Sequence, residues 1–178
     1  MFILMCGMPS CGKSAAIDII AESDDATPLW VIRPEEWLPD NITELSPQED
    51  KEQRIGCWQK AMDAAEKAVE EHDPSEVIVL DCTNSKYRPL ESLLRRAKRN
   101  KHKLVIMYVN SGVAQCEARA GDSWIGPEIA KIYIRNIRDS LPKFKSKCDR
   151  IVIIANNDSL DILEENVLAA WSKLCPIT

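Results

Sequence analysis

The stretch GMPSCGKS, residues 7–14, has the residue types and the spacing needed to hold a phosphate group. It fits the pattern G-x-x-x-x-G-K-[ST], in which a glycine turn aims backbone N–H groups into one concavity and the following helix adds its positive end. Lys13 reaches the β- and γ-phosphates of a nucleotide, and the Ser14 hydroxyl is a ligand for Mg²⁺. The sequence therefore predicts a site for ATP and Mg²⁺ that is formed by Gly7, Met8, Pro9, Ser10, Cys11, Gly12, Lys13 and Ser14.

Carboxylates follow two other apolar runs. Asp81 comes directly after VIVL, and an acid at the end of a buried strand can hold Mg²⁺ directly or through water. Glu35 and Glu36 follow LWVI in the stretch RPEEW, and either could take the proton of an acceptor hydroxyl that lies in line with the γ-phosphate. A structural alternative stays open for each group, because Asp81 could be a turn residue and the glutamates could be surface carboxylates.

The elements that must position these residues are apolar runs that alternate with helical patterns. Five runs are continuous in hydrophobicity, as strands buried on both faces of a parallel sheet are: 2–6, 29–32, 76–81, 104–109 and 150–155. Helical patterns cover 13–22, 48–71, 89–100, 113–118, 127–141 and 160–174. This alternation predicts an α/β fold, a three-layer sandwich with a five-stranded parallel sheet and helices on both faces.

The composition is that of an ordinary globular domain, and one domain over residues 1–178 is predicted. The chain is 45% hydrophobic and 29% charged. Its apolar runs are far shorter than the roughly 20 residues that cross a bilayer, so no transmembrane helix and no membrane partner are predicted. The seven cysteines form no CxxC pair and no short cluster with histidine, which argues against a zinc site or a disulfide framework and favours a cytoplasmic location.

Charge is distributed unevenly along the chain, whose net charge is −5. Segment 86–103, KYRPLESLLRRAKRNKHK, holds eight Lys and Arg residues against one Glu. Four apolar residues in it share one side of a helix, so the cations could be a solvated helix face: Leu90, Leu93, Leu94 and Ala97. The alternative is a surface that binds a polyanion such as a nucleic acid.

The order of the motifs resembles that of the phage-type polynucleotide 5′-hydroxyl kinases. GMPSCGKS, RPEEW, LDCTNSKYR, CEARAGDSWIGPEIAKIYIRNI and KCDRIVII occur in the same order as in this group and cover nearly the whole chain. The resemblance implies the fold of a kinase-type P-loop NTPase with a strand order of 2-3-1-4-5. It also implies five residue roles: Lys13 and Ser14 bind nucleotide and metal, Glu35 is the general base, Asp81 is the strand-end acid, and Arg119 is the lid arginine that stabilises transferred charge.

The leading prediction is therefore a phosphotransferase that uses ATP and Mg²⁺ and moves the γ-phosphoryl group to a hydroxyl, with the 5′ end of a nucleic acid as acceptor. A lid of about residues 119–126 is expected to cover the donor. Leu38 stands where the resembled group has an arginine for the substrate phosphate, which favours the alternative of a nucleoside or other small-metabolite kinase. A second alternative is a nucleotide-binding adaptor without catalysis.

Three further side chains have secondary predictions. Cys11 lies near the amino end of a predicted helix and close to Lys13, and both features favour the thiolate, so a lowered pKa and a reactive thiol are predicted. An inert, buried thiol is the alternative. Trp37 and Trp124 could stack on a nucleobase or could pack in the core.

Overall fold

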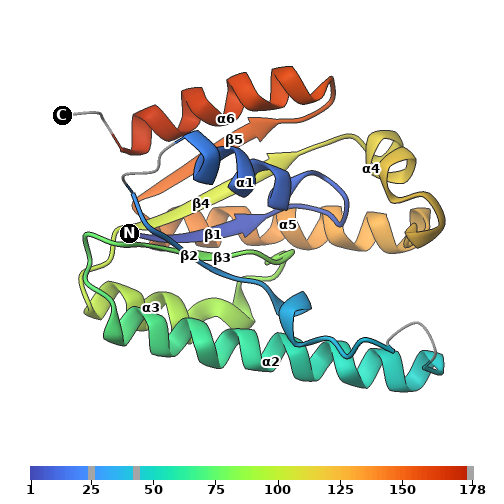
Figure 1. Cartoon of the computed structure of the whole chain (residues 1–178), viewed down its shortest axis with the longest axis horizontal. Coiled ribbons are helices and arrows are strands. Elements are labelled where there is room, and N and C mark those ends of the chain that lie inside the picture. Colours follow the sequence, from blue (N-terminus) through green and yellow to red (C-terminus); the bar gives the residue numbers. More distant parts are fainter. Residues whose placement is uncertain (24–26, 42–44, 176–178) are drawn as a thin grey trace.

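A five-stranded parallel sheet with the order β2-β3-β1-β4-β5 forms the centre of the molecule (Figure 1). The computed structural model describes residues 1–23, 27–41 and 45–175. The strands are β1 (Phe2–Cys6), β2 (Leu29–Ile32), β3 (Val77–Leu80), β4 (Leu104–Asn110) and β5 (Arg150–Ala155). The predicted fold class and strand order are therefore confirmed.

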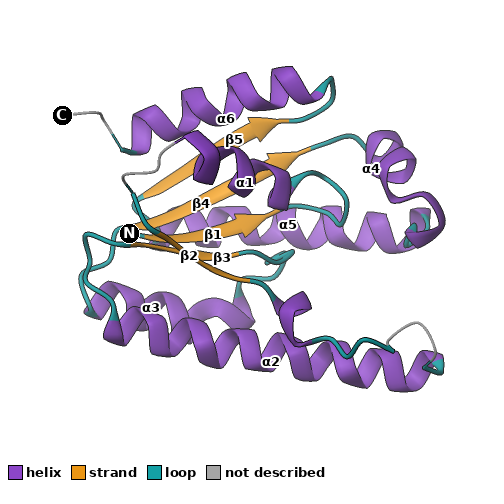
Figure 2. Ribbon diagram, viewed as in Figure 1, coloured by secondary structure: helices purple, strands orange, loops and turns teal. Residues whose placement is uncertain are grey.

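Helices cover both faces of the sheet, which makes three layers (Figure 2). They are α1 (Lys13–Ser23), α2 (Pro47–Glu71), α3 (Glu91–Arg99), α4 (Val113–Ala120), α5 (Pro127–Lys147) and α6 (Leu160–Leu174). α1 packs against α6 on one face, and α2 packs against α3 on the other. α5 lies beside the α3 layer, because the ring of Phe144 contacts that of Tyr87 with centroids 5.5 Å apart. In the described part of the chain, no helix combines the length and the apolar character that a membrane span requires.

The central strands form the core because their apolar residues are buried on both faces. Phe2, Leu4, Ile78, Leu80 and Ile106 are all fully buried, and burial of each such side chain stabilises the fold by about 1.5–3 kcal/mol. The prediction of two buried faces is wrong for β5. Among the described residues this strand pairs with β4 alone, and its Ile153 is 63% exposed. A continuous apolar run thus does not distinguish an edge strand from a central one.

Tertiary contacts extend α5 past the end that its sequence predicts. The helix continues through Pro142, which removes one backbone donor, and ends at Lys147. Two contacts with the segment before α3 hold it: Ser140 Oγ accepts a hydrogen bond of 3.0 Å from the Tyr87 amide, and Phe144 is fully buried. Packing therefore outweighs the local cost of the proline.

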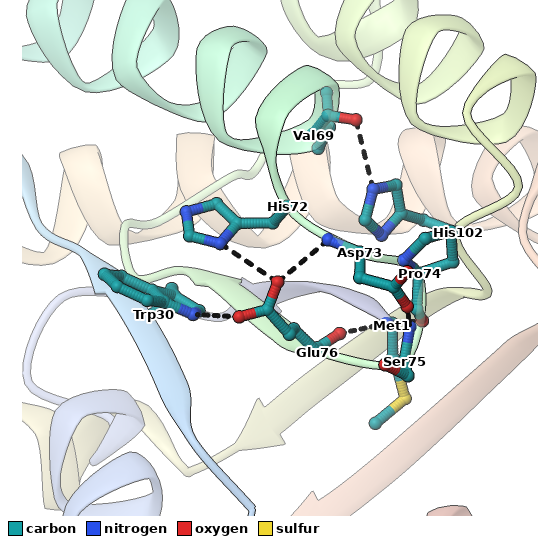
Figure 3. Close-up of polar contacts among 9 residues, drawn as sticks. All are labelled: Met1, Trp30, Val69, His72, Asp73, Pro74, Ser75, Glu76 and His102. Carbon is teal, nitrogen blue, oxygen red and sulfur yellow. Dashed lines mark hydrogen bonds and ion pairs between the residues drawn. The ribbon is translucent and has the colours of Figure 1, made fainter.

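A polar cluster ties the amino ends of the strands together (Figure 3). The Met1 amino group donates to the carbonyl oxygens of Pro74, at 2.8 Å, and Glu76. The Glu76 carboxylate accepts a hydrogen bond from Trp30 Nε1 at 3.1 Å and lies 3.2 Å from Nδ1 of His72. The rings of His72 and Trp30 are in contact, with their centroids 4.2 Å apart. The start of β1 is thus fixed to the turn that precedes β3.

His102, next to this cluster, makes the stability of the fold depend on pH. It is 3% exposed, its Nε2 lies 3.1 Å from the Val69 carbonyl oxygen, and burial lowers its pKa below the ordinary value of 6.5. The unfolded chain therefore binds this proton more readily, so the free energy of unfolding falls as the pH drops below 6.5. We expect His102→Gln to flatten that dependence between about pH 7 and 5 in urea unfolding. Equal slopes for both proteins would contradict this assignment.

Candidate active site

The loop between β1 and α1 has a backbone that only glycine accommodates at two positions. Gly7 has a φ of 153° and Gly12 a φ of 95°. A Cβ at Gly7 would lie 2.5 Å from Cys11 Sγ and 2.7 Å from the Val109 carbonyl oxygen, and one at Gly12 would lie 2.3 Å from Asn156 Nδ2. Conformation and space both require glycine here, so the loop can close tightly in front of the amino end of α1.

Lys13 places a positive charge inside this loop. Its Nζ donates to the carbonyl oxygens of Met8, at 2.8 Å, and Gly7, at 3.4 Å, and the residue is only 9% exposed. Within the described residues, no carboxylate forms an ion pair with it. A buried ammonium group without a counter-ion is costly, so the loop favours an anionic ligand at this point.

Ser14 and Asp81 offer oxygen atoms to the same cleft. Asp81 is almost fully buried, and its Oδ2 accepts a hydrogen bond of 3.1 Å from Arg33 Nε, while Arg33 Nη2 lies 2.9 Å from Asp18 Oδ1. A hydroxyl and a carboxylate oxygen are the hard ligands that Mg²⁺ prefers. No group of three or more His, Cys, Asp or Glu side chains arranged for a metal occurs in the described ranges.

A cleft of about 880 Å³ extends from the phosphate loop toward α2 and the beginning of α5. Glu35 of the short 3₁₀ helix η1 (Pro34–Trp37) lines it, together with Thr83 from the segment after β3. Trp58 and Tyr133 supply aromatic walls, and Arg54 supplies a cation whose Nε lies 2.8 Å from Asp50 Oδ1. The cleft therefore combines a carboxylate, hydroxyl groups and aromatic rings within one space that also includes the phosphate loop.

Six of the predicted functional residues line this cleft: Pro9, Ser10, Lys13, Ser14, Glu35 and Asp81. Both carboxylates reach it because β2 and β3 end at the same edge of the sheet, next to the loop that follows β1. Glu35 and Glu36 are both exposed, but Glu36 does not line the cleft. The geometry therefore favours Glu35 over Glu36 as the carboxylate closest to an acceptor.

Arg119 does not line the cleft in this structure. Its guanidinium group donates to Ser111 Oγ at 3.0 Å and to the Asn156 carbonyl oxygen at 3.2 and 3.3 Å, and it lies 3.1 Å from Asn156 Oδ1. These partners follow the ends of β4 and β5. Its role toward a transferred phosphate therefore stays a prediction.

Asn156, which the sequence motifs do not single out, connects Arg119 to the phosphate loop. Its side chain is buried, and its Nδ2 donates to the Cys11 carbonyl oxygen at 2.8 Å. The backbone N–H of Asn156 also donates to the Asn110 carbonyl oxygen at 2.9 Å, which fixes the residue to the end of β4. The amide side chain therefore sets the position of the loop backbone beside Gly12.

We expect Asn156→Leu to weaken ATP binding by about tenfold and to lower the free energy of unfolding by about 1–3 kcal/mol, because it leaves the buried Cys11 carbonyl oxygen without this donor. Calorimetric titration and urea unfolding measure the two effects. Asn166→Leu is the matched control, since Asn166 Nδ2 also donates to a backbone carbonyl, that of Ala155, but at an exposed position. Equal ATP affinity in the Asn156 variant and the wild type would exclude a positioning role.

The predicted reactivity of Cys11 is wrong. The side chain is fully buried, and burial raises the pKa of its thiol, although the charge of Lys13 acts in the opposite direction. Cys6 and Cys82 are buried nearby, and burial raises the pKa of each to about 12. Desolvation thus outweighs the attraction of the lysine, so these thiols are packing residues of the loop.

The predicted nucleobase platforms also lie outside the cleft. Trp37 and Trp124 are half-buried and pack against the core. The aromatic side chains that line the cleft are Trp58 and Tyr133. Sequence patterns missed these two because each lies within a long helix, where an aromatic residue is more often a core contact.

The end of the basic segment lies at the amino ends of the strands, away from the phosphate loop (Figure 1). Its first cation, Lys86, follows β3 and lines a small pocket with Trp58 and Thr83, which also line the cleft. α3 runs back toward the amino ends of the strands, and its last residues lead into the start of β4. Arg96 binds to α2 through one ion pair of 3.2 Å with Glu66 and another with Glu70. None of the cations of α3 lines the cleft.

Comparison with protein-family models and with curated proteins gives no match. Solved structures do match. A gluconokinase from Sinorhizobium meliloti 1021 aligns at 17% identity and a TM-score of 0.62, covering 97% of this chain and 91% of that protein. The fold is that of P-loop kinases. A deoxyadenosine kinase from M. mycoides, solved with the products dCMP and dCDP, aligns at 13% identity and a TM-score of 0.62, covering 98% and 100%. A sugar kinase from Janibacter sp. HTCC2649 aligns at 15% identity and a TM-score of 0.58, covering 98% of this chain and 95% of that protein.

Proposed function

We propose that this P-loop protein is an ATP-dependent phosphotransferase whose acceptor is a hydroxyl group of a small metabolite. One observation carries the proposal: the phosphate loop with Lys13 and the carboxylate of Glu35 line a single cleft of about 880 Å³. Pockets of about 300–1,000 Å³ suit small-molecule ligands. Donor and acceptor would therefore meet between the loop and η1.

Four side chains of the cleft, together with Arg33, have defined tasks in this proposal. Backbone amides of the loop and Lys13 bind the β- and γ-phosphates and stabilise the charge that develops on them during transfer. Ser14 and Asp81 would hold Mg²⁺, which neutralises phosphate charge when it is bound. Arg33 fixes the Asp81 carboxylate in place through its hydrogen bond of 3.1 Å. Glu35 accepts the proton of the attacking hydroxyl.

A small acceptor has more support than the polynucleotide end that the motif order predicts. The cations of α3 do not line the cleft, so the phosphates of a polymer would find no matching cations along α3 beside the phosphate loop. The named activities of the structural neighbours concern gluconate, a deoxynucleoside and a sugar. Trp58 and Tyr133 could stack on a sugar or base ring, while Thr83 and Ser123 could bind its hydroxyl groups.

Transfer of label from γ-³²P-ATP to a panel of acceptors tests the proposal. The panel contains sugars, sugar acids, nucleosides and 5′-hydroxyl oligonucleotides of DNA and RNA. We expect label in at least one small acceptor and none in the oligonucleotides. Label in oligonucleotides alone would replace this proposal by the polynucleotide reading. ATP binding without transfer to any acceptor would favour the non-catalytic adaptor.

A further inference from the structure

A second polar pocket, of about 440 Å³, lies between α3 and the end of α5. It is near the amino ends of the strands, so the length of β1, about 16 Å for five residues, separates it from the phosphate loop. Four cations line it: Arg95, Lys98, Arg99 and Lys147. None of these residues belongs to the cleft described above, so the function of this pocket is a separate question.

The cations of this pocket have few opposite charges near them. Arg95, Lys98 and Arg99 share one side of α3, because they are three and four residues apart, and Lys147 comes from α5. The acid that lines the pocket is Glu91, which lies 3.5 Å from Arg95 Nη2. Among the described residues, Lys98, Arg99 and Lys147 have no ion-pair partner. The pocket thus carries a local excess of positive charge in a chain whose net charge is −5.

The favourable interaction of cations with the carboxyl ends of helices does not account for this cluster. The ends of α3 and α5 carry partial negative charge, which favours cations in the last turn of each. That partial charge is about half an elementary charge per helix, whereas the two helices bring four full positive charges to one pocket. The remaining positive potential in a concave, partly apolar space favours an anionic ligand.

We propose that this pocket binds a compact ligand with two or more linked phosphate groups, such as an inorganic polyphosphate or the phosphate chain of a nucleotide. Arginine forks and lysine ammonium groups are the donors that recognise phosphate oxygens. Leu94 and Leu104 form an apolar floor, which also suits the ring of a nucleotide. A volume of about 440 Å³ suits one small molecule rather than an extended strand.

Calorimetric titration with sodium tripolyphosphate tests this site independently of the proposed function. The phosphate loop also binds this probe, so the wild type is expected to bind two molecules per chain. The triple variant Lys98→Gln, Arg99→Gln, Lys147→Gln should keep only the loop site, with affinity at the pocket lowered at least about tenfold. Lys13→Ala should keep only the pocket. The control is a second triple variant that removes the same number of positive charges from exposed positions of α2: Lys51→Gln, Lys60→Gln, Lys67→Gln. This control should still bind two molecules of tripolyphosphate per chain.

The two ways of failing give different results. One binding site in the wild type that Lys13→Ala removes would overturn the pocket and leave the proposed function intact. One site that the triple variant removes would support the pocket and contradict the phosphate loop. Titration with ATP and with a twelve-residue oligothymidylate separates the ligand sources. Binding of the oligonucleotide alone through these cations would overturn a compact ligand and indicate a nucleic-acid surface.

Discussion

Lys13→Ala is expected to abolish the rise in melting temperature that Mg-ATP gives the wild type. A ligand at one hundred times its dissociation constant stabilises the fold by about 2.7 kcal/mol, which corresponds to about 5–10 °C for a domain of this size. Lys13 Nζ lies inside the loop, bound to the Met8 carbonyl oxygen at 2.8 Å and to no carboxylate among the described residues. Its charge is therefore available to phosphate, and its removal eliminates the main cation of the loop.

Thermal melts with and without Mg-ATP measure this effect. Without nucleotide, the variant should unfold within a few degrees of the wild type, because removal of a buried charge without a partner also removes its desolvation cost. Lys60→Ala, on the exposed side of α2, is the control and should keep the full shift. An Mg-ATP shift of wild-type size in Lys13→Ala would rule out the phosphate loop as the nucleotide site.

Glu35→Gln is expected to lower turnover by about 10²- to 10⁴-fold while ATP affinity stays nearly constant. Glutamine keeps the shape and hydrogen-bonding capacity of the side chain but cannot accept a proton from the acceptor hydroxyl. Glu35 lines the cleft, whereas the Mg²⁺ ligands of the proposal are Ser14 and Asp81. Loss of the carboxylate should therefore affect the chemical step and not the binding of the nucleotide.

Steady-state kinetics on the labelled acceptor, combined with ATP titration, separates the two effects. Glu36→Gln is the matched control, since Glu36 is the next residue in η1 and lies outside the cleft. It should keep turnover within a factor of about two to three, as a solvated surface side chain. Wild-type turnover in Glu35→Gln would transfer the base role to another carboxylate, and a loss of ATP binding would indicate a metal ligand.

The sequence was sufficient to predict the sheet because the signal for each strand is local. Each strand is a short apolar run that ends at a turn, and the phosphate loop is a motif with a fixed backbone geometry. The end of α5 was not predictable in this way. Pro142 favours a stop, and only the buried Phe144 and the contact of Ser140 with Tyr87, far along the chain, explain why the helix continues.

The site was predictable where a residue type follows a strand or a glycine loop. Lys13, Ser14, Glu35 and Asp81 all line the cleft because the ends of parallel strands meet at one edge of the sheet. Asn156, Trp58 and Tyr133 could not be found, since their places depend on how distant segments pack. Cys11 was misjudged for a related reason. Its sequence neighbours favour a thiolate, but its burial is a property of the folded chain.

Phosphorus NMR of ATP, Mg²⁺ and the best small acceptor with the purified protein tests the central claim most directly. The claim is that one cleft moves the γ-phosphoryl group to a hydroxyl. We expect the γ-phosphate signal of ATP to decline while signals of ADP and of a new phosphomonoester grow at equal rates, and we expect neither change with Lys13→Ala. Formation of ADP with inorganic phosphate alone, or unchanged ATP signals in the presence of bound nucleotide, would contradict the claim.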